Sequence, residues 1–324
     1  MTSDLQALVN QINTRLDKLE YGKEPIELYD PIQYIMSLGG KRLRPVLVLL
    51  SYSLFKDDYE KILGPAIAVE VFHNFTLMHD DIMDEAPLRR GKQTVHEKWN
   101  ESTAILSGDV MLVQAYELLL ETDADLRAII KDFNATAAGV CEGQQLDMNF
   151  ESLPTVSEEE YINMIRLKTA VLLGYSLKLG AFLANRSKKE ADDLYEFGVD
   201  IGLGFQLKDD LLDVYADQAK FGKQVGGDII SNKKTFLLLK SLELANPEQK
   251  AELQAWIDKT EFDPSEKVEA IKAIYAQQGI RDLTLAKMQE YYDKGFAALH
   301  HLNIPAERKQ PLIDFTNYLI NRDK

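Results

Sequence analysis

Apolar residues recur along this chain with the period of an α-helix. Leu5, Leu8 and Ile12, for example, are three or four residues apart, which places them on one face of an amphipathic helix. The sequence has no convincing two-residue alternation and no Asn-Gly or Asp-Gly hairpin turn, so strands are not expected. The periodicity therefore predicts an all-α fold.

Prolines and capping residues predict where the helices begin. Proline is favoured at a first helical position because its missing N–H would have no intrahelical partner there. Ser157 with Glu160 matches a capping box. Four prolines are taken as helix starts: Pro31, Pro65, Pro247 and Pro264. The expected helices cover residues 62–78, 101–121, 126–148, 157–184, 188–214, 233–246, 247–259, 264–278, 283–302 and 305–320.

The chain is expected to form one domain, residues 1–324. No Ser-, Gly- or Pro-rich linker divides it, and no repeat with a period of roughly 20 to 50 residues is evident. Apolar residues cover nearly every face of 62–78, which is typical of a buried central helix. We predict a bundle of long helices around a deep central cavity.

Charge and composition exclude several kinds of protein. The net charge of −15 argues against nucleic acid as a partner, because phosphate backbones bind basic surfaces. The single cysteine, Cys141, rules out an intramolecular disulfide and suits a reducing compartment. No apolar stretch is long enough for a transmembrane segment, and the first residues do not resemble a secretory signal. We therefore predict a cytoplasmic protein.

Two aspartate-rich motifs are the strongest chemical signal. Asp80, Asp81 and Asp84 lie at the end of the predicted central helix, with Asp80 and Asp84 four residues apart on one face. Like charges at that spacing cost roughly 0.2–0.5 kcal/mol, and the helix dipole disfavours anions at a C-terminus. A divalent cation would turn this repulsion into binding. The pattern recurs about 130 residues later in Asp209, Asp210 and Asp213.

The ligand chemistry favours Mg²⁺. Only oxygen ligands are available in these motifs, and no HExxH or CxxC pattern suggests zinc. One such motif alone would more often be a solvated acidic turn. Two copies inside apolar helices instead predict facing walls of one cavity, where metal ions bridge to a bound anion.

Basic clusters could supply the partners for that anion. Gly39 and Gly40 precede Lys41, and their freedom would allow the backbone to approach a phosphate closely. Such a cluster is usually only a solvated surface, but Arg89 follows Asp84 by five residues and must lie near the proposed metal. The remaining candidates are Arg44, Arg90, Lys168, Thr169, Lys223 and Lys233. His73, two turns before Asp80, is either a core residue or a donor to a diphosphate.

Six segments, in order and spacing, resemble the trans-isoprenyl diphosphate synthases, which include farnesyl and geranylgeranyl diphosphate synthases. They read GGKRLRP, LMHDDIMDEAPLRRG, GDVML, LKTA, GFQLKDDLLD and GKQVGGDIISNKKT. The resemblance implies an isoprenoid synthase-like all-α fold, a homodimer and three Mg²⁺ per active site. It implies a prenyltransferase that joins isopentenyl diphosphate to dimethylallyl, geranyl or farnesyl diphosphate, giving farnesyl or geranylgeranyl diphosphate.

The resemblance also assigns roles to residues. Asp80 and Asp84 would bind two metal ions and Asp209 the third, while Asp81, Asp210 and Asp213 would hold metal-bound water or nearby basic side chains. The allylic diphosphate would contact Arg89, Lys168, Thr169, Gln206, Lys223 and Lys233. Isopentenyl diphosphate would contact Lys41, Arg44, His73 and Arg90. The catalytic set is Asp80, Asp84, Arg89, Lys168, Gln206 and Asp209. Leu237 departs from the proline common in the family, at a position that is not a ligand.

Product length is expected to depend on the side chains beneath the first motif. Phe75 lies five residues before Asp80, next to the small Thr76, and Phe72 lies deeper. This pattern resembles family members that make farnesyl or geranylgeranyl diphosphate, and we favour the latter. Replacing Phe75 by alanine should lengthen the product, as measured by mass spectrometry.

Two other functions compete with this interpretation. A class I terpene cyclase also binds Mg²⁺ at an aspartate-rich motif, but it normally lacks a second DDxxD and has no use for Lys41, Arg44 and His73. A non-catalytic subunit of a heteromeric synthase would be expected to have lost one motif, whereas both are intact here.

Overall fold

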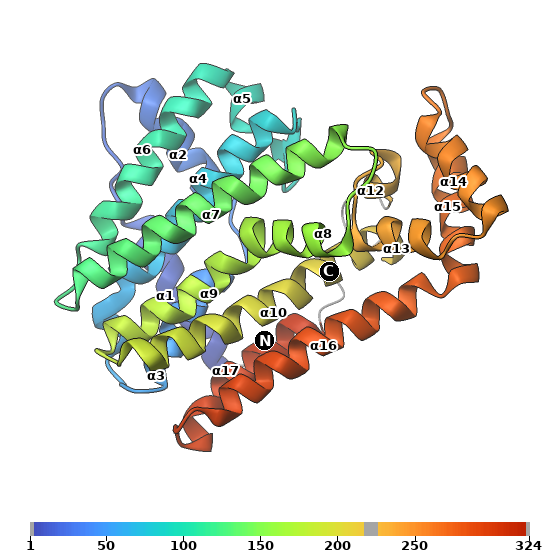
Figure 1. Cartoon of the computed structure of the whole chain (residues 1–324). Coiled ribbons are helices and arrows are strands. Elements are labelled where there is room, and N and C mark those ends of the chain that lie inside the picture. The colour runs from blue at the N-terminus through green and yellow to red at the C-terminus, as the bar shows by residue number, and fades with distance from the viewer. Residues whose placement is uncertain (1–2, 217–225, 322–324) are drawn as a thin grey trace. The chain divides into compact units, whose positions relative to one another are not determined.

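The computed structural model describes residues 3–216 and 226–321, and it confirms the all-α fold (Figure 1). Outside its helices, the described part of the chain has one antiparallel ribbon of two-residue strands, β1 (Leu88–Arg89) and β2 (Lys92–Gln93). Strands this short have no detectable sequence period, so the ribbon was not expected. No helix in the described ranges is long and apolar enough to cross a membrane.

The contacts within the chain define two compact units. Unit 1 comprises residues 1–135, 172–195 and 302–315, and unit 2 comprises residues 136–171, 196–301 and 316–324. Four helices contribute residues to both: α7 (Leu126–Ser152), α9 (Val171–Leu183), α10 (Lys188–Tyr215) and α17 (Ala306–Ile320). The single domain over 1–324 stays a prediction, and the units are described one at a time.

Unit 1 is built around α4 (Leu63–Met83). Residues on several faces of this helix, including Ile67, Val69 and Val71, are fully buried, as expected of a central helix. The helix ends at Met83, so the first aspartate motif lies at its C-terminal end, as predicted. It packs against α1 (Ser3–Asp17), α2 (Ile26–Ser37), α3 (Leu43–Ser53), η1 (Tyr59–Ile62), α5 (Val95–Lys98) and α6 (Glu101–Leu119). The ribbon joins α2 through the Tyr34 hydroxyl, which donates to the Gln93 carbonyl at 2.7 Å.

The prolines confirm the predicted helix starts with one exception. Pro247 and Pro264 occupy first-turn positions after capping residues, and Pro65 lies in the first turn of α4. Pro31 does not begin a helix, so that prediction was wrong: it lies inside α2, which begins at Ile26. The helix tolerates the missing hydrogen bond because tertiary burial of its apolar face, including Ile32, stabilises it.

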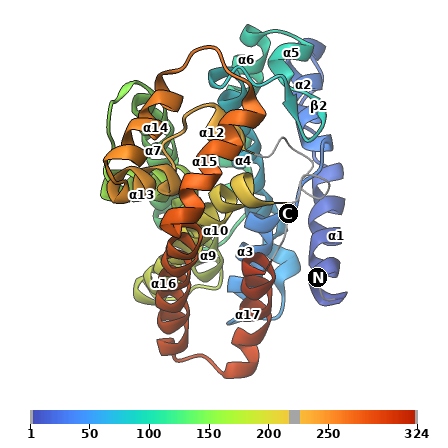
Figure 2. The same cartoon turned by 90° about the vertical axis from the view of Figure 1, so that its right-hand side faces the viewer.

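Unit 2 contains the C-terminal helices and the middle of the chain. α15 (Pro264–Gln278) packs against α12 (Gly227–Ile230), α13 (Phe236–Leu244), α14 (Pro247–Asp258) and α16 (Ile280–His301) (Figure 2). The helix expected over 157–184 is interrupted. It begins as α8 (Glu158–Ile165) with the predicted capping box, passes through a π-helical turn, η2 (Arg166–Ala170), and continues as α9. π-helical turns are rare and are frequently found at functional sites.

Candidate active site

The first aspartate motif lies where α4 ends. Asp84 is the C-cap, and its N–H donates to the Asp80 carbonyl at 2.9 Å. Asp81 is buried and accepts two hydrogen bonds from Arg89, from Nε and Nη2, both at 2.7 Å. Asp80 is half-buried and Asp84 exposed. The motif is thus divided, with Asp81 holding a basic side chain while Asp80 and Asp84 lie on the more accessible part of the helix end.

Arg90 joins the ribbon to the glycine-rich loop. The Arg90 side chain donates from Nη1 to the Gly39 carbonyl. A Cβ atom at Gly40 would lie 3.1 Å from Nη2 of the same guanidinium, and Gly39 and Gly40 both have positive φ angles, 78° and 151°. The two glycines thus allow the positive φ angles and leave room for the Arg90 guanidinium. Arg90, which was predicted to bind isopentenyl diphosphate, therefore lies beside the loop that carries Lys41.

A buried ion pair fixes the same loop to α4. Arg42 has a left-handed backbone, with φ at 52°, and its Nη1 lies 2.7 Å from Glu70 Oε1. The guanidinium also donates to Asn13 Oδ1 at 3.0 Å and to the Met36 carbonyl at 3.3 Å. Sequence reasoning missed this pair. The signal was available, because Glu70 is an isolated acid in an otherwise apolar helical segment and requires a buried partner.

His73 lies one turn along α4 from Glu70. Burial, and then the positive charges of Arg44, Arg90 and Arg89, hold the pKa of its imidazole well below the ordinary value. The ring is therefore neutral near pH 7 and can donate one hydrogen bond. Unit 1 thus brings three of the residues predicted for isopentenyl diphosphate, Arg44, His73 and Arg90, into one positively charged cluster.

The side chains predicted to set product length form part of an aromatic cluster in unit 1. Phe75 contacts the Phe72 ring, with centroids 5.6 Å apart, and the His79 ring at 4.8 Å. Phe72 in turn contacts Phe133 at 5.1 Å. The Thr76 hydroxyl donates to the His73 carbonyl at 2.8 Å. Phe75 therefore packs within an aromatic cluster, and its role in setting product length stays a prediction.

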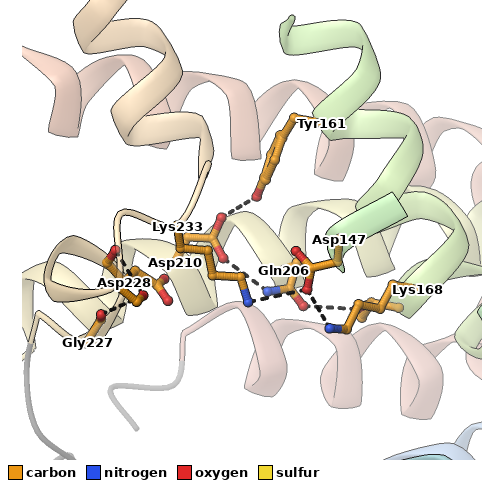
Figure 3. A network of polar contacts seen from close by, with 10 residues as sticks. Asp147, Tyr161, Lys168, Gln206, Asp210, Gly227, Asp228 and Lys233 are labelled. Atoms are coloured by element: carbon orange, nitrogen blue, oxygen red, sulfur yellow. Dashed lines mark hydrogen bonds and ion pairs between the residues drawn. The ribbon is translucent and has the colours of Figure 1, made fainter. Parts of the chain in front are cut away.

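The second motif, in unit 2, is tied together by a chain of hydrogen bonds (Figure 3). Tyr161 donates its buried hydroxyl to Asp210, and Gln206 Nε2 donates to the same carboxylate at 3.0 Å. Thr169 Oγ1 donates to Gln206 Oε1, also at 3.0 Å. These contacts bring two residues predicted for the allylic diphosphate, Thr169 and Gln206, next to the aspartates.

Negative charge is crowded at this motif. Burial, and then the charge of Asp228, raise the pKa of Asp210 to about 8, although hydrogen bonds from Tyr161 and Gln206 oppose the rise. Asp213 Oδ2 accepts the Asp228 N–H at 2.9 Å, which ties the 226–232 loop to the end of α10. Asp209 lies on the same helix, one residue before Asp210. A bound cation would relieve this crowding, so the residues present fit a metal site.

Two lysines predicted to bind the diphosphate meet at one carboxylate. Lys168 Nζ lies 2.6 Å from Asp147 Oδ2, and Lys233 Nζ lies 3.6 Å from the same oxygen (Figure 3). Burial works against ionisation of Asp147, but Lys233 and Lys168 together hold its pKa below the ordinary value. Sequence reasoning missed Asp147, because a single acid on a mixed helix carries no motif. Lys223 lies outside the described residues.

In the described ranges, no three His, Cys, Asp or Glu side chains are grouped so as to hold a metal ion by themselves. Mg²⁺ usually takes only one or two carboxylates and completes its shell with water and substrate phosphates. Asp80 and Asp84 could supply such carboxylate ligands in unit 1, and Asp209 could supply one in unit 2. That the two motifs face one cavity stays a prediction of the sequence.

Comparisons with known proteins agree with these features. The polyprenyl synthetase family model matches residues 25–276. A geranylgeranyl pyrophosphate synthase from Geoglobus acetivorans is 37% identical over 315 residues, 96% of each chain. The crystal structure of a geranylgeranyl pyrophosphate synthase is 45% identical and superposes with a TM-score of 0.93, covering 100% of both chains. A polyprenyl synthase from Caulobacter crescentus CB15, complexed with calcium and isoprenyl diphosphate, is 28% identical, with a TM-score of 0.86 over 99% of this chain and 95% of that one.

Proposed function

Because the chain belongs to the polyprenyl synthetase family and is a prenyltransferase, we propose that it condenses isopentenyl diphosphate with an allylic diphosphate. The products are diphosphate and a short-chain trans-prenyl diphosphate, either farnesyl or geranylgeranyl diphosphate. The geranylgeranyl product is favoured because two similar proteins bear that name. The starter is dimethylallyl, geranyl or farnesyl diphosphate.

One observation carries the proposal: in each unit, aspartates at a helix end lie beside basic residues. In unit 1, Arg89 and Arg90 follow Asp84 by five and six residues in the sequence, and Arg89 donates two hydrogen bonds to Asp81. In unit 2, the acids of α10 join Thr169 and Gln206, and Lys168 and Lys233 meet at Asp147. Acids that bind cations, next to cations that bind phosphates, suit a substrate that carries a metal-bound diphosphate.

The chemistry begins when the allylic C–O bond breaks and the diphosphate takes the electron pair. Arg89, Lys168 and Lys233 stabilise the charge that develops on the leaving oxygens, which lowers the barrier. Asp80, Asp84 and Asp209 would hold the three expected Mg²⁺ ions, which would add positive charge at the same place. Apolar walls, including Phe75, exclude water that would capture the allylic cation.

The new carbon–carbon bond forms when the isopentenyl double bond attacks the allylic cation. Arg44, His73 and Arg90 hold the isopentenyl diphosphate, and the neutral His73 contributes a hydrogen bond without a further charge. A proton is then lost from the resulting tertiary cation, and the double bond of the product forms. The released diphosphate accepts that proton, so the chain needs no separate catalytic base.

A homodimer and a cytoplasmic location are part of the proposal. One face of α6 and its C-cap supports a second copy of the chain as the partner. Leu106, Val113 and the C-cap Leu120 are seven residues apart and 58%, 59% and 50% exposed. An apolar stripe along a helix is typical of a subunit interface. Light scattering of wild type and L106E/V113E tests it, because two charges in the stripe should yield monomers. Fractionation of cells tests the location.

The proposed function is tested by incubating the purified chain with isopentenyl diphosphate, each allylic diphosphate and Mg²⁺. Diphosphate release with a longer prenyl diphosphate in the mass spectrum is expected. A cyclised hydrocarbon would instead identify a terpene cyclase. Turnover that appears only after a second protein is added would identify a non-catalytic subunit.

A further inference from the structure

A lysine of unit 2, Lys267, is buried although the oxygens that accept its hydrogen bonds carry no charge. The residue is 1% exposed, and its ammonium group donates to the Ile230 carbonyl at 3.1 Å and to Asn232 Oδ1 at 2.7 Å. The centroid of the Phe262 ring lies 4.3 Å from Nζ. Burial lowers the pKa of this ammonium group, so keeping the charge here costs free energy.

The position of Lys267 in its own helix does not account for the charge. Lys267 is the fourth residue of α15, at the end of the first turn, where the helix dipole favours anions. An apolar side chain of the same length would fill the space without the desolvation cost of an ammonium group. The role of the charge must therefore lie in the two groups that it binds.

Both groups belong to the segment that carries Lys233. This segment, residues 226–235, contains α12 and leads into α13, and α12 packs against α15 (Figure 2). Asn232 has a left-handed backbone, with φ at 55°, and its Nδ2 donates to the Ile257 carbonyl of α14 at 3.1 Å. Asn232 is thus held by α15 on one side and by α14 on the other, and Lys233 follows it directly.

The start of the same segment rests on the next residue of α15. Gly226 has φ at 84°, and a Cβ atom there would lie 2.6 Å from a methyl carbon of Val268. Between the two ends, the Asp228 N–H donates to Asp213 Oδ2 at 2.9 Å. Consecutive residues of α15 therefore hold the beginning and the end of a segment whose middle binds the second aspartate motif.

We propose that Lys267 is a positioning residue for the allylic diphosphate. Lys267 is buried and does not touch the substrate; it fixes the 226–235 segment, so that Lys233 meets the diphosphate from a constant place. Lys267 lines one small cavity together with Lys233 and Asp228, so the support lies directly behind the proposed ligand. The inference rests on the proposed function, because Lys233 is taken to bind the leaving diphosphate.

Two variants remove this support from its two partners. Lys267→Met keeps the length of the side chain and removes the ammonium group. Asn232→Gly removes the amide and keeps the left-handed backbone, which glycine adopts readily. In steady-state kinetics with both substrates varied, each variant should raise KM for the allylic diphosphate about three- to tenfold, the effect of one or two lost hydrogen bonds. KM for isopentenyl diphosphate should not change.

Double-mutant cycles show whether the effect passes through the proposed ligand. Because the two variants break the same contact, Lys267→Met/Asn232→Gly should be little worse than Lys267→Met alone. In a Lys233→Met background, neither change should raise the allylic KM much further. Hydrogen exchange of the full chain without substrate gives a readout besides activity: the amides of residues 226–235 should exchange faster in both variants.

Lys309→Met is a matched control. Lys309 is also a buried lysine, 6% exposed, whose ammonium group donates to a main-chain carbonyl, that of Leu302 at 2.6 Å. It lies in unit 1 and is not a candidate ligand. Its replacement should lower stability as Lys267→Met does, but both Michaelis constants should keep their wild-type values.

The outcomes are distinct. A wild-type allylic KM in Lys267→Met and Asn232→Gly would overturn the inference. Effects that add to that of Lys233→Met would also overturn it, because Lys267 would then stabilise the chain without acting through Lys233. If wild type shows no prenyl transfer at all, the proposed function fails, and this inference fails with it. Should Lys267→Met not fold, Asn232→Gly takes its place in the cycle with Lys233→Met.

Discussion

Carboxylates in this molecule differ according to which charge lies beside them. Asp81 is buried against the Arg89 guanidinium, and Asp147 against two ammonium groups, so each has its compensating cation within the protein. Asp210 is buried next to Asp228, and its pKa rises to about 8 as a result. The first kind organises basic side chains, whereas at the second kind burial and a neighbouring carboxylate favour the protonated form, which a bound cation would reverse.

The environment of His73 makes the free energy of unfolding depend on pH. Burial and the neighbouring arginines hold its pKa well below 6.5 in the folded chain, whereas in the unfolded chain it protonates near that value. Below about pH 6.5 the unfolded state therefore binds the additional proton, so acidification favours unfolding through this residue. The contribution changes by about 1.4 kcal/mol per pH unit until the folded pKa is reached.

Denaturant unfolding of wild type and His73→Gln between pH 7 and pH 5 checks this. Glutamine does not titrate, so the free energy of unfolding of wild type should decline relative to the variant as the pH falls. Parallel curves across this range would show that His73 is protonated equally in both states, which would contradict a neutral donor to a diphosphate.

At the scale of the elements, a buried arginine–glutamate pair joins the glycine-rich loop to α4. Arg42 and Glu70 have side chains only 6% and 3% exposed. Arg42→Met leaves Glu70 buried without its cation, which should lower the free energy of unfolding by about 3–5 kcal/mol. In the double variant Arg42→Met/Glu70→Leu most of that loss should be recovered, because no buried charge remains.

Chemical denaturation of the two single variants and the double variant measures this. Because the pair anchors the loop that carries Lys41, KM for isopentenyl diphosphate should stay raised in the double variant even where stability returns. Strictly additive losses of stability would mean that the two charges do not interact.

The contact between α7 and the π-helical turn can be tested with two glycines on one face. A Cβ at Gly143 would lie 2.2 Å from Lys168 N, while one at Gly139 would lie 3.4 Å from a Leu167 methyl carbon, an ordinary contact. Gly143→Ala should therefore cost about 1–3 kcal/mol of stability by overpacking. Gly139→Ala should cost nothing or gain up to about 1 kcal/mol from helix propensity. Thermal unfolding distinguishes them, and equal effects would show that η2 does not depend on close packing.

Helix periodicity and capping were enough to predict most elements, because both are local. α15 begins and ends as expected at Pro264 and Gln278, and the capping box at Ser157 is present. The π-helical turn could not be predicted in the same way, because it shares the apolar pattern of an ordinary helix. The prediction from Pro31 was wrong because tertiary burial of α2 outweighed the local preference of proline for a first helical position. Asp147 was missed because its significance lies in partners 21 and 86 residues away in sequence.

On the scale of the whole molecule, the proposal requires the two aspartate motifs to share one ligand. Mg²⁺ with inorganic diphosphate should stabilise wild type, by about 2.7 kcal/mol at a hundredfold excess over Kd. If one diphosphate bridges cations on both motifs, Asp80→Asn and Asp209→Asn should each abolish most of that gain, and the double variant should lose little more. Two independent sites would instead give partial losses that add. Asp57→Asn, at a side chain 87% exposed, is the control for loss of a negative charge and should keep the full gain. Thermal shifts of these variants, with and without the ligands, decide between one shared site and two.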